Sequence, residues 1–391
     1  MCIAIWSTKN QLGYKLILAF NRDEFLNRPS LPANWHSFEQ VNQQYQAFSS
    51  TPPASPTSLS SLPSLSSSSS LSSMSPTESL SEPNNYIASG HQVNQQDKLE
   101  QKSDILSGID VVTGATWLGI SKTSGKFAFL TNIESPQTNI VDNREESNQF
   151  KQSFSFKLSR GRIIQDFLQS SKSIKSYLNK LKSSHSSKIM KGYNLVIGQI
   201  GKTDEEENQF GFFCNQEPDI IDGVDVWNDN DYGRSFMGYS DVHGISNGVA
   251  HQAPILPKVS HGICLMEDCL SKLAGEKPDR IDQNEVEMEL FNLLTQVSND
   301  SNEDTSSNIL IRPHHRLKTP DTPISSQTWC GTKTQTILLA SQTPKTRITL
   351  VERDAFQIQP TSTPTKDVQP VWMGDDMSRW RRFEFNLTAN S

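Results

Sequence analysis

The sequence predicts an α+β protein in which antiparallel strands are layered with helices. Strand-like segments are joined by short turn-forming loops, and helical spacing occurs only in separate segments. Several strand candidates are also apolar on both faces, such as residues 16–20 (LILAF) and 337–340 (ILLA). Strands covered on both faces suit sheets stacked between other layers. We therefore expect a layered αββα sandwich.

Three hairpins are expected among the strand candidates. In each, two apolar segments flank a loop that contains turn residues such as Gly13, Gly125 or Pro344. The paired segments are residues 2–6 with 14–20, 116–121 with 126–132, and 334–341 with 347–353. Further strand candidates of ordinary length are residues 193–200, 210–215 and 237–240.

Helical spacing of apolar residues occurs in three segments. The pattern i, i+3, i+4 is typical of a helix with one buried face. It is found at residues 163–168, 174–181 and 286–297. We expect these helices to cover the outer faces of the sheets.

The composition indicates one domain with a large insertion. The 391 residues are only 34% hydrophobic, which is low for a chain that folds throughout. Residues 40–103 are polar, and serine and proline dominate residues 51–83. Such a segment cannot bury enough apolar area to offset its conformational entropy. We predict a single domain over residues 1–391, interrupted by a disordered insertion at 40–103.

Charge and motifs exclude several classes of protein. A net charge of −7 argues against binding to nucleic acid or to a membrane surface. No apolar run approaches the roughly 18 residues of a membrane span, and the first residues do not resemble a signal peptide. We therefore expect a cytosolic protein. No dinucleotide or Walker motif occurs, and Cys264 and Cys269 lack the second pair that a zinc site needs. The five cysteines are expected to be reduced.

The first hairpin brings Cys2 next to a polar sequence. The apolar residues 16–20 are followed at once by Asn21, Arg22, Asp23 and Glu24. In an antiparallel hairpin, the start of the first strand lies beside the end of the second. Cys2 should therefore lie within a few ångströms of residues 21–23.

This arrangement is suited to nucleophilic catalysis. If Met1 is removed, Cys2 carries both a thiol and an α-amine whose ordinary pKa is about 7.7 to 8.0. Arg22 would favour the thiolate, and Asp23 would hold the ammonium or the guanidinium by charge-assisted hydrogen bonds. Enzymes that use an N-terminal nucleophile in this way cleave amide bonds. The alternative is that Cys2 only begins a buried strand and that Arg22 and Asp23 form an ion pair at a strand end.

Several separated motifs resemble the transport and Golgi organisation protein 2 family, also called the NRDE family after residues 21–24. They are MCIAIW, YKLILAFNRDEFLNRP, GATWLGISKTSGKFAFLTN, SRGRIIQDFL, YNLVIGQI, HGISN, PKVSHG and CGTKTQTILLA, in that order. The resemblance implies a fold like that of the N-terminal-nucleophile hydrolases, with two antiparallel sheets between helical layers.

The resemblance also implies roles for particular residues. Cys2 matches the nucleophile, and residues 21–24 match the motif beside it. By similarity to cysteine-type amidases, Asn247 is a candidate for stabilising an oxyanion, a contact worth about 3 to 4 kcal/mol in such sites. The alternative for Asn247 is a turn residue. Other motif or pocket residues are Trp117, Asn132 and Lys333, although Trp117 is also expected to fill the core.

Two positions depart from the family pattern. The family usually has Gly-Thr-Arg-Ser where this chain has Gly331-Thr332-Lys333-Thr334. Lysine replaces the planar guanidinium of arginine, which can bind a carboxylate through two hydrogen bonds, with a point charge. This weakens the case for a contact to a substrate carboxylate at Lys333. A double glycine of the family is Gly114-Ala115 here, which alters a close backbone approach.

The implied functions are Golgi organisation and protein secretion, mobilisation of haem, and lipid or acyl-coenzyme A homeostasis. The implied locations are the cytoplasm, the Golgi apparatus and mitochondria. Two alternatives are an amidase or thioesterase that uses Cys2, and a non-catalytic carrier of haem or an acyl chain. No cofactor is required, and haem or acyl-coenzyme A would be a small-molecule ligand. There is no C-x-x-C-H attachment motif, and His314 and His315 form the one local basic cluster with their arginine neighbours.

Overall fold

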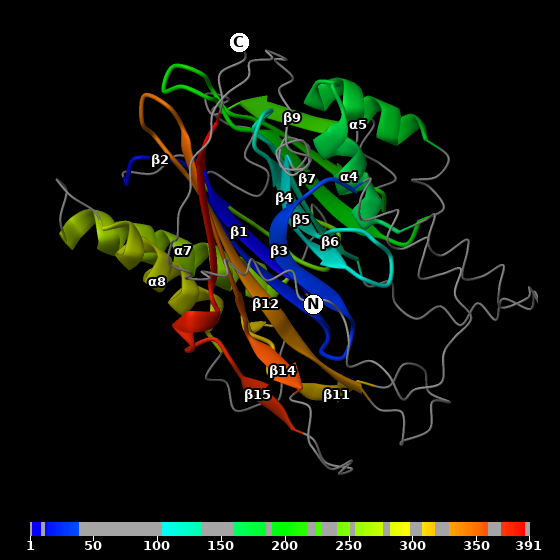
Figure 1. Ribbon diagram of the computed structural model, residues 1–391, viewed down its shortest axis with the longest axis vertical. Helices are drawn as coiled ribbons and strands as arrows, with labels where there is room; N and C mark the ends of the chain where they lie inside the picture. The colour runs from blue at the N-terminus through cyan, green and yellow to red at the C-terminus, as the bar shows by residue number, and fades with distance from the viewer. Residues whose placement is uncertain are drawn as a thin grey trace, which may run out of the picture.

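Two antiparallel sheets form the centre of the computed structural model, and helices lie on the outside of each (Figure 1). Each sheet contains seven strands within the part of the chain that the structure describes. The described residues are 2–8, 12–38, 104–133, 159–184, 190–216, 224–228, 241–250, 255–276, 282–297, 307–316, 328–358 and 369–387. The predicted insertion at 40–103 and the strand candidate at 237–240 lie outside these ranges.

The first sheet contains both chain-terminal strands. Its members are β1 (Ile3–Ser7), β2 (Tyr14–Phe25), β10 (Val242–Ile245), β11 (His314–Arg316), β12 (Thr328–Ser341), β13 (Arg347–Asp354) and β16 (Arg381–Asn386). The strand order is β10-β1-β2-β12-β13-β16, and β11 pairs with β12. The long strand β2 therefore lies at the centre of the sheet.

The second sheet follows the chain order from one edge to the other. Its members are β3 (Ser30–His36), β4 (Ile105–Asp110), β5 (Leu118–Ser121), β6 (Lys126–Asn132), β7 (Tyr193–Gln199), β8 (Gln209–Cys214) and β9 (Val224–Asn228). A separate pair is formed by β14 (Phe356–Ile358) and β15 (Pro370–Trp372). The helices are α4 (Gly161–Gln169), α5 (Ile174–Ser183), α7 (Pro257–Glu276), α8 (Gln283–Leu294) and the short 3-10 helix η3 (Met377–Arg379).

Three apolar clusters define the layers. The middle cluster joins the two sheets, for example where Trp6 of β1 packs edge-on against Phe129 of β6 with ring centres 5.4 Å apart. A second cluster lies between the first sheet and helices α7 and α8. A third lies between the second sheet and helices α4 and α5. The structure is thus a mixed α+β fold as predicted, and the three clusters fit the predicted layers.

The three predicted hairpins are confirmed. Strand β1 pairs with β2, β5 with β6, and β12 with β13, all antiparallel. Gly13 and Gly125 have φ angles of 77° and 70°, a backbone region that favours glycine. The strand candidates at 193–200 and 210–215 are present as β7 and β8.

Strand β2 is longer than the sequence predicts. The polar residues 21–24 do not end it, because they remain paired with the neighbouring strand β12. The register places Asn21 opposite Gln335 and Asp23 opposite Thr332, with an irregularity between Thr332 and Thr334. Hydrogen bonds to a partner strand keep a polar segment extended as well as an apolar one. The interpretation of residues 21–24 as a strand end is therefore wrong.

Helices α4, α5 and α8 confirm the three predicted helices, but α7 was not predicted. A glycine in its middle lowers the helix propensity of the segment. The structure shows why glycine is present: a Cβ atom at Gly262 would lie 2.5 Å from Cδ1 of Ile5. Glycine thus allows α7 to pack closely on β1, a tertiary effect that the local sequence does not reveal.

Candidate functional site

Residues 21–24 alternate between the two faces of the first sheet. Asn21 and Asp23 share the face of Ile17 and Ala19, which packs on helices α7 and α8. The Asn21 amide donates hydrogen bonds of 2.9 Å to the carbonyls of Leu294 and Ile309 on this side. Arg22 and Glu24 share the face of Leu18 and Phe20, which points toward the second sheet. Because strand side chains alternate with period two, the motif serves two layers at once.

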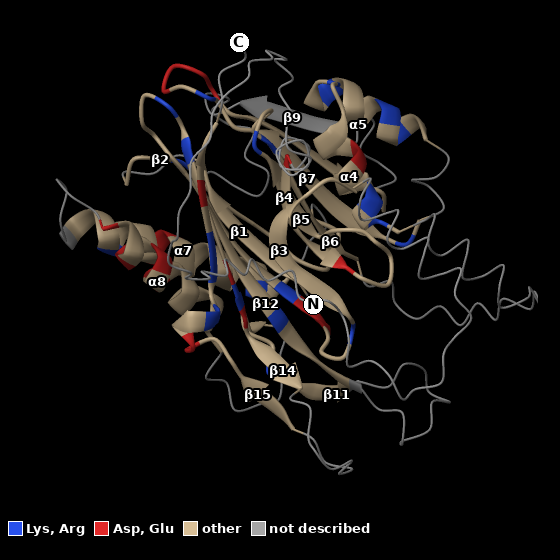
Figure 2. Cartoon of the chain, in the orientation of Figure 1, with Lys and Arg blue, Asp and Glu red and all other residues tan. Residues whose placement is uncertain are grey.

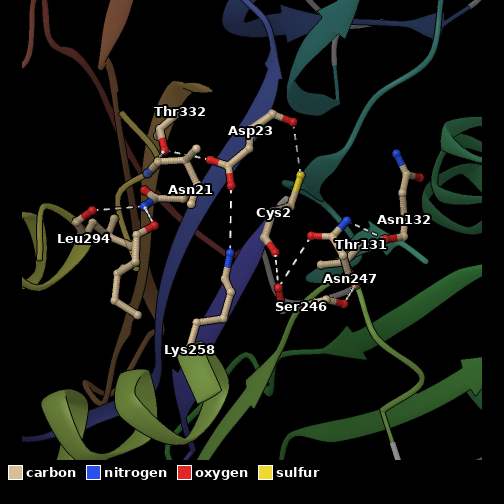
Figure 3. A network of polar contacts seen from close by, with 12 residues as sticks. Cys2, Asn21, Asp23, Thr131, Asn132, Ser246, Asn247, Lys258, Leu294 and Thr332 are labelled. Atoms are coloured by element: carbon tan, nitrogen blue, oxygen red, sulfur yellow. Dashed lines mark hydrogen bonds and ion pairs between the residues drawn. The ribbon is translucent and has the colours of Figure 1, made fainter. Parts of the chain in front are cut away.

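Cys2 lies at the start of β1 on the face that points toward the second sheet. Its neighbour Ile3 pairs with Asn21, so Cys2 comes next to the motif, as the hairpin predicts. The Cys2 Sγ donates to the main-chain carbonyl of Asp23 at 3.7 Å, and the Cys2 carbonyl accepts a 2.7 Å hydrogen bond from Ser246 Oγ (Figure 3). These two contacts fix the thiol and its backbone.

Burial raises the pKa of the Cys2 thiol. The Asp23 carboxylate acts in the same direction, whereas the amino-terminal charge and Arg22 lower the pKa of the thiol. The predicted effect of Arg22 on the thiolate therefore has the right sign, but burial outweighs it. The net result is a Cys2 pKa above the ordinary value of a thiol.

Arg22 is buried beside Cys2. Both side chains lie on the face of the first sheet that points toward the second sheet. Its guanidinium carbon lies 3.8 Å from the ring centre of Trp117, a cation–π distance. Its ion-pair partner is Glu24, with 3.9 Å between Nη2 and Oε2. Burial lowers the pKa of Arg22. Trp117 belongs to the middle core cluster, as expected for a core residue, and its role in a pocket stays a prediction.

The Asp23 carboxylate lies on the helix side of the sheet. Thr332 Oγ1 donates a 2.7 Å hydrogen bond to Asp23 Oδ1, and Lys258 Nζ of helix α7 lies 3.9 Å from Asp23 Oδ2 (Figure 3). The predicted pairing of Asp23 with the Arg22 guanidinium is corrected by this geometry, because the two side chains leave opposite faces of β2. The residue that faces the Asp23 carboxylate, Lys258, is itself fully buried.

Asn247 follows β10 and lies across from β6. Its side-chain amide donates a hydrogen bond to the main-chain carbonyl of Asn132. The neighbouring Ser246 carbonyl accepts a 2.6 Å hydrogen bond from Thr131 Oγ1. These bonds tie residues 246 and 247 to the end of β6, close to Cys2 (Figure 3). One amide N–H of Asn247 is used in this way, and an asparagine amide has two. Both the oxyanion role and the turn role stay predictions.

Lys333 supports the chain after β2. Its Nζ donates to the main-chain carbonyls of Leu26, at 3.1 Å, and Arg28. Burial, together with the nearby Arg22 cation, lowers the pKa of Lys333 to about 8. Because carbonyl oxygens already hold this ammonium group, the geometry favours a structural role over a contact to a substrate carboxylate.

Sequence reasoning missed several residues of this region. Lys258 and Thr332 contact the Asp23 carboxylate, and Ser246 donates to the Cys2 carbonyl. Arg160 interacts electrostatically with Cys2 and Glu24. Lys258 stands in the PKVSHG motif, so the motif gave a signal without a role. Ser246, Thr332 and Arg160 likewise stand in the motifs HGISN, CGTKTQTILLA and SRGRIIQDFL, and only the tertiary arrangement shows what they contact.

Histidines lie apart from Cys2 where the structure describes them. His243 is buried and stacks on Trp6 with ring centres 5.3 Å apart, and burial lowers its pKa to about 4. His314 and His315 are exposed, and His315 lies against the Trp329 ring at 3.8 Å. Across the described ranges, no three His, Cys, Asp or Glu side chains are grouped so that they could hold a metal ion.

Comparison with known proteins assigns the chain to a family. The model of the family described as Transport and Golgi organisation 2 matches residues 1–45 and 91–357. The match includes Cys2, residues 21–24, Lys258 and Lys333, and it omits residues 46–90 in the middle of the predicted insertion. A search of curated proteins gave no match. Among the described residues, no helix is long and apolar enough to cross a membrane. Because the family model matches most of its length, this chain belongs to the Transport and Golgi organisation 2 family.

Proposed function

We propose that this protein serves Golgi organisation and protein secretion by processing a small acyl compound as an N-terminal cysteine hydrolase. The position of Cys2 carries the proposal. Its thiol lies directly before β1, on the face of the first sheet that points toward the second sheet, next to Arg22 and within reach of the Asp23 carbonyl. The proposed substrate class is a small amide or an acyl thioester.

The proposed chemistry begins after removal of Met1. The free α-amine of Cys2 takes the thiol proton, and the thiolate attacks the substrate carbonyl carbon. The bond to the leaving amine or thiol then breaks, and the leaving group takes the proton from the α-ammonium. A water molecule hydrolyses the resulting thioester, with the α-amine again accepting a proton. Asn247 is the candidate donor to the oxyanion in both steps.

The raised pKa of Cys2 sets a condition on this mechanism. A thiol held neutral by burial reacts slowly, since the thiolate is the nucleophile. Removal of Met1 would make Cys2 the first residue and supply the amine base. Activity should therefore require a chain that begins at Cys2.

Intact-mass measurement combined with iodoacetamide labelling tests the proposal. The native protein is labelled at a series of pH values, and the exposed Cys264 is followed as an internal reference. We expect Met1 to be absent and Cys2 to react with an apparent pKa below the ordinary value of about 8.5. A set of acyl amides and thioesters is then tested for turnover by the wild type and by Cys2→Ala.

Two results would contradict the hydrolase. One is retention or acetylation of the first residue, since neither form has a free amine at Cys2. The other is an inert Cys2 in a chain that has lost Met1. A Cys2→Ser variant with the same turnover as Cys2→Ala would show that the thiolate, rather than the amine alone, is needed.

A non-catalytic carrier of haem or an acyl chain is the second candidate. The observation in its favour is that Cys2 is buried, which raises the pKa of its thiol. Such a carrier would connect the family to haem mobilisation and to lipid or acyl-coenzyme A homeostasis. Titration with haem is its test: a Soret shift at micromolar protein supports carriage, and an unchanged haem spectrum counts against it.

We also propose that the fold is related to that of the N-terminal-nucleophile hydrolases. The support is a pair of face-to-face antiparallel sheets between helices, with Cys2 directly before β1. The proposed location is the cytoplasm, in association with the Golgi apparatus or mitochondria. Fractionation of cells that express a tagged full-length chain would test this location.

A further inference from the structure

The Arg22 guanidinium has an unused hydrogen-bonding nitrogen. Arg22 is only 4% exposed, yet its Nη1 has no hydrogen-bond partner among the described residues. Its nearest acid, Glu24, is 3.9 Å from the other terminal nitrogen. A buried N–H group without a partner costs free energy, so native proteins rarely retain one without a reason. A bound acceptor would remove this cost.

A second arginine lies close to the same place. Arg160 precedes helix α4, whose first turn contains no acidic residue and no side-chain cap. Helix α4 begins at Gly161 against the second sheet, where a Cβ atom would lie 2.4 Å from the Thr116 carbonyl oxygen. The residue after Thr116 is Trp117, on which Arg22 lies. The start of α4 and the Arg22 guanidinium therefore flank one short segment.

Cys2 and Glu24 act electrostatically on both arginines. The Cys2 thiol and the Glu24 carboxylate both raise the pKa of Arg22 and of Arg160, against the larger lowering effect of burial. Nη1 of Arg160 donates a 2.9 Å hydrogen bond to the Gly192 carbonyl, and a guanidinium has five N–H donors in all.

Cations outnumber acids at this end of the sheets. Figure 2 shows basic and acidic residues grouped near the N label, beside β12. Arg28 and Asp110 form an ion pair with 2.7 Å between Nη2 and Oδ2, and Lys333 donates to carbonyl oxygens. Glu24 is shared: it lies 3.9 Å from Arg22 and 3.6 Å from Arg28, it also acts on Arg160, and it is partly exposed. The balance is an excess of positive charge next to the thiol.

We propose that Arg22 and Arg160 form an oxyanion-binding subsite beside Cys2, for a carboxylate or phosphate carried by the acyl compound. Arginine suits this task because its planar fork binds such groups through two hydrogen bonds. Trp117 holds the Arg22 fork in place through its ring face. The subsite indicates that the substrate of the proposed hydrolase carries a carboxylate or phosphate. This inference rests on the proposed hydrolase function.

Binding of matched probes to full-length protein tests the subsite without any turnover. The probes are dodecanoylglycine, its neutral methyl ester and dodecyl phosphate, and the protein carries Cys2→Ala so that no hydrolysis occurs. Calorimetry should show tighter binding of at least one anionic probe than of the ester, and weakening of that binding by salt. Arg160→Gln should weaken binding of the anionic probe by about tenfold and leave binding of the ester unchanged.

Two further variants keep the test decisive. Arg22→Lys retains the buried charge but removes the planar guanidinium, so it should weaken binding of the anionic probe. This variant can be used even if Arg22→Gln fails to fold. Arg379→Gln removes an exposed arginine of η3 and should bind all probes like the parent protein. Preference for the carboxylate or for the phosphate identifies the group that the subsite accepts.

The outcomes separate the subsite from the proposed function. Equal binding of the acid, the phosphate and the ester, or normal anion binding by both Arg160→Gln and Arg22→Lys, would overturn the subsite. Charge-selective binding without turnover by the Cys2-initiated wild type would retain the subsite and reject the hydrolase. Turnover that is the same for charged and neutral substrates would retain the hydrolase and reject the subsite.

Discussion

The Asp23 carboxylate is buried against helix α7 and faces Lys258 there. The side chains of both residues are at most 1% exposed, and the distance between Lys258 Nζ and Asp23 Oδ2 is 3.9 Å. Removing one partner of such a pair leaves the other charge in a poorly solvated place. The most informative change is therefore at Lys258, which leaves the motif itself intact.

Lys258→Met should lower the free energy of unfolding by about 3 kcal/mol or more, because Asp23 is left without this cation. Urea denaturation followed by circular dichroism measures the change. Adding Asp23→Asn to Lys258→Met should restore part of the loss, since the buried carboxylate charge that Lys258 faced is then removed. Lys272→Met in the same helix is the control: its pair with Glu289 is exposed and should contribute at most about 1 kcal/mol. Equal losses at positions 258 and 272 would contradict a buried ion pair.

His243 should make the protein less stable as the pH falls. Its folded pKa is lowered from 6.5 to about 4 by burial, so the unfolded chain binds the proton more readily. Stability is therefore fully present above about pH 6.5 and is lost as the pH falls toward the folded value of about 4. His36, whose pKa is also lowered to about 4, acts in the same direction.

His243→Phe keeps a ring against Trp6 and removes the titrating group. Between about pH 7 and pH 4.5, the variant should lose roughly 2 kcal/mol less stability than the wild type does. Urea denaturation at the two pH values gives this difference. His314→Phe, at an exposed position, should leave the pH dependence unchanged. A wild-type slope in the His243→Phe variant would show that the buried imidazole does not resist protonation.

At the scale of single elements, strand β2 shows what local patterns can and cannot predict. The two apolar segments and the turn at Gly13 between them predicted the hairpin, and hence the position of Cys2 beside residues 21–23. The end of β2 was not predictable in this way. It depends on pairing with β12, a strand from the other end of the chain. Helix α7 was not predicted for a related reason. Gly262 is needed for close packing on Ile5 of β1, and it does not favour the helix itself.

The packing of α7 on β1 gives a prediction of its own. Gly262→Ala should destabilise the protein by about 1 to 3 kcal/mol, because the new methyl group meets Cδ1 of the fully buried Ile5. Ile5→Val removes the Cδ1 atom, so the double variant should be more stable than the two single losses predict when added. Gly275→Ala lies in the same helix with nothing within 4 Å of its Cβ, and should be neutral or slightly stabilising. Additive losses at Gly262 and Ile5 would contradict the contact.

At the scale of the whole molecule, the layers were predictable but the bonds between them were not. Apolar residues on both faces of several strands are enough to indicate stacked sheets. The polar contacts that join the layers connect residues from distant parts of the sequence, as in the bond from Thr131 to the Ser246 carbonyl. No periodic pattern marks such pairs. The same limit explains why Lys258 and Arg160 were missed at the candidate site.

Glu352 of β13 is a polar tie between the two sheets. Its Oε1 accepts a 2.8 Å hydrogen bond from the Ala33 N–H of β3 and lies 3.0 Å from Arg381 Nε. The residue is 1% exposed, so water cannot replace these partners. Burial raises the pKa of Glu352, whereas Arg381 and the Ala33 N–H lower it. A charged group in this place is retained only because both partners satisfy it.

Glu352→Ala should lower the free energy of unfolding by about 3 to 5 kcal/mol, since it leaves the Ala33 N–H and the Arg381 guanidinium without this acceptor. Hydrogen exchange measured by mass spectrometry should show the faster exchange first in peptides that contain β3, because that strand is at an edge of its sheet and loses its tie to the first sheet. Glu384→Ala removes an exposed partner of Arg347 and Arg382, and should change stability by at most about 1 kcal/mol. Unchanged exchange in β3 of the Glu352→Ala protein would mean that apolar packing alone holds the two sheets together.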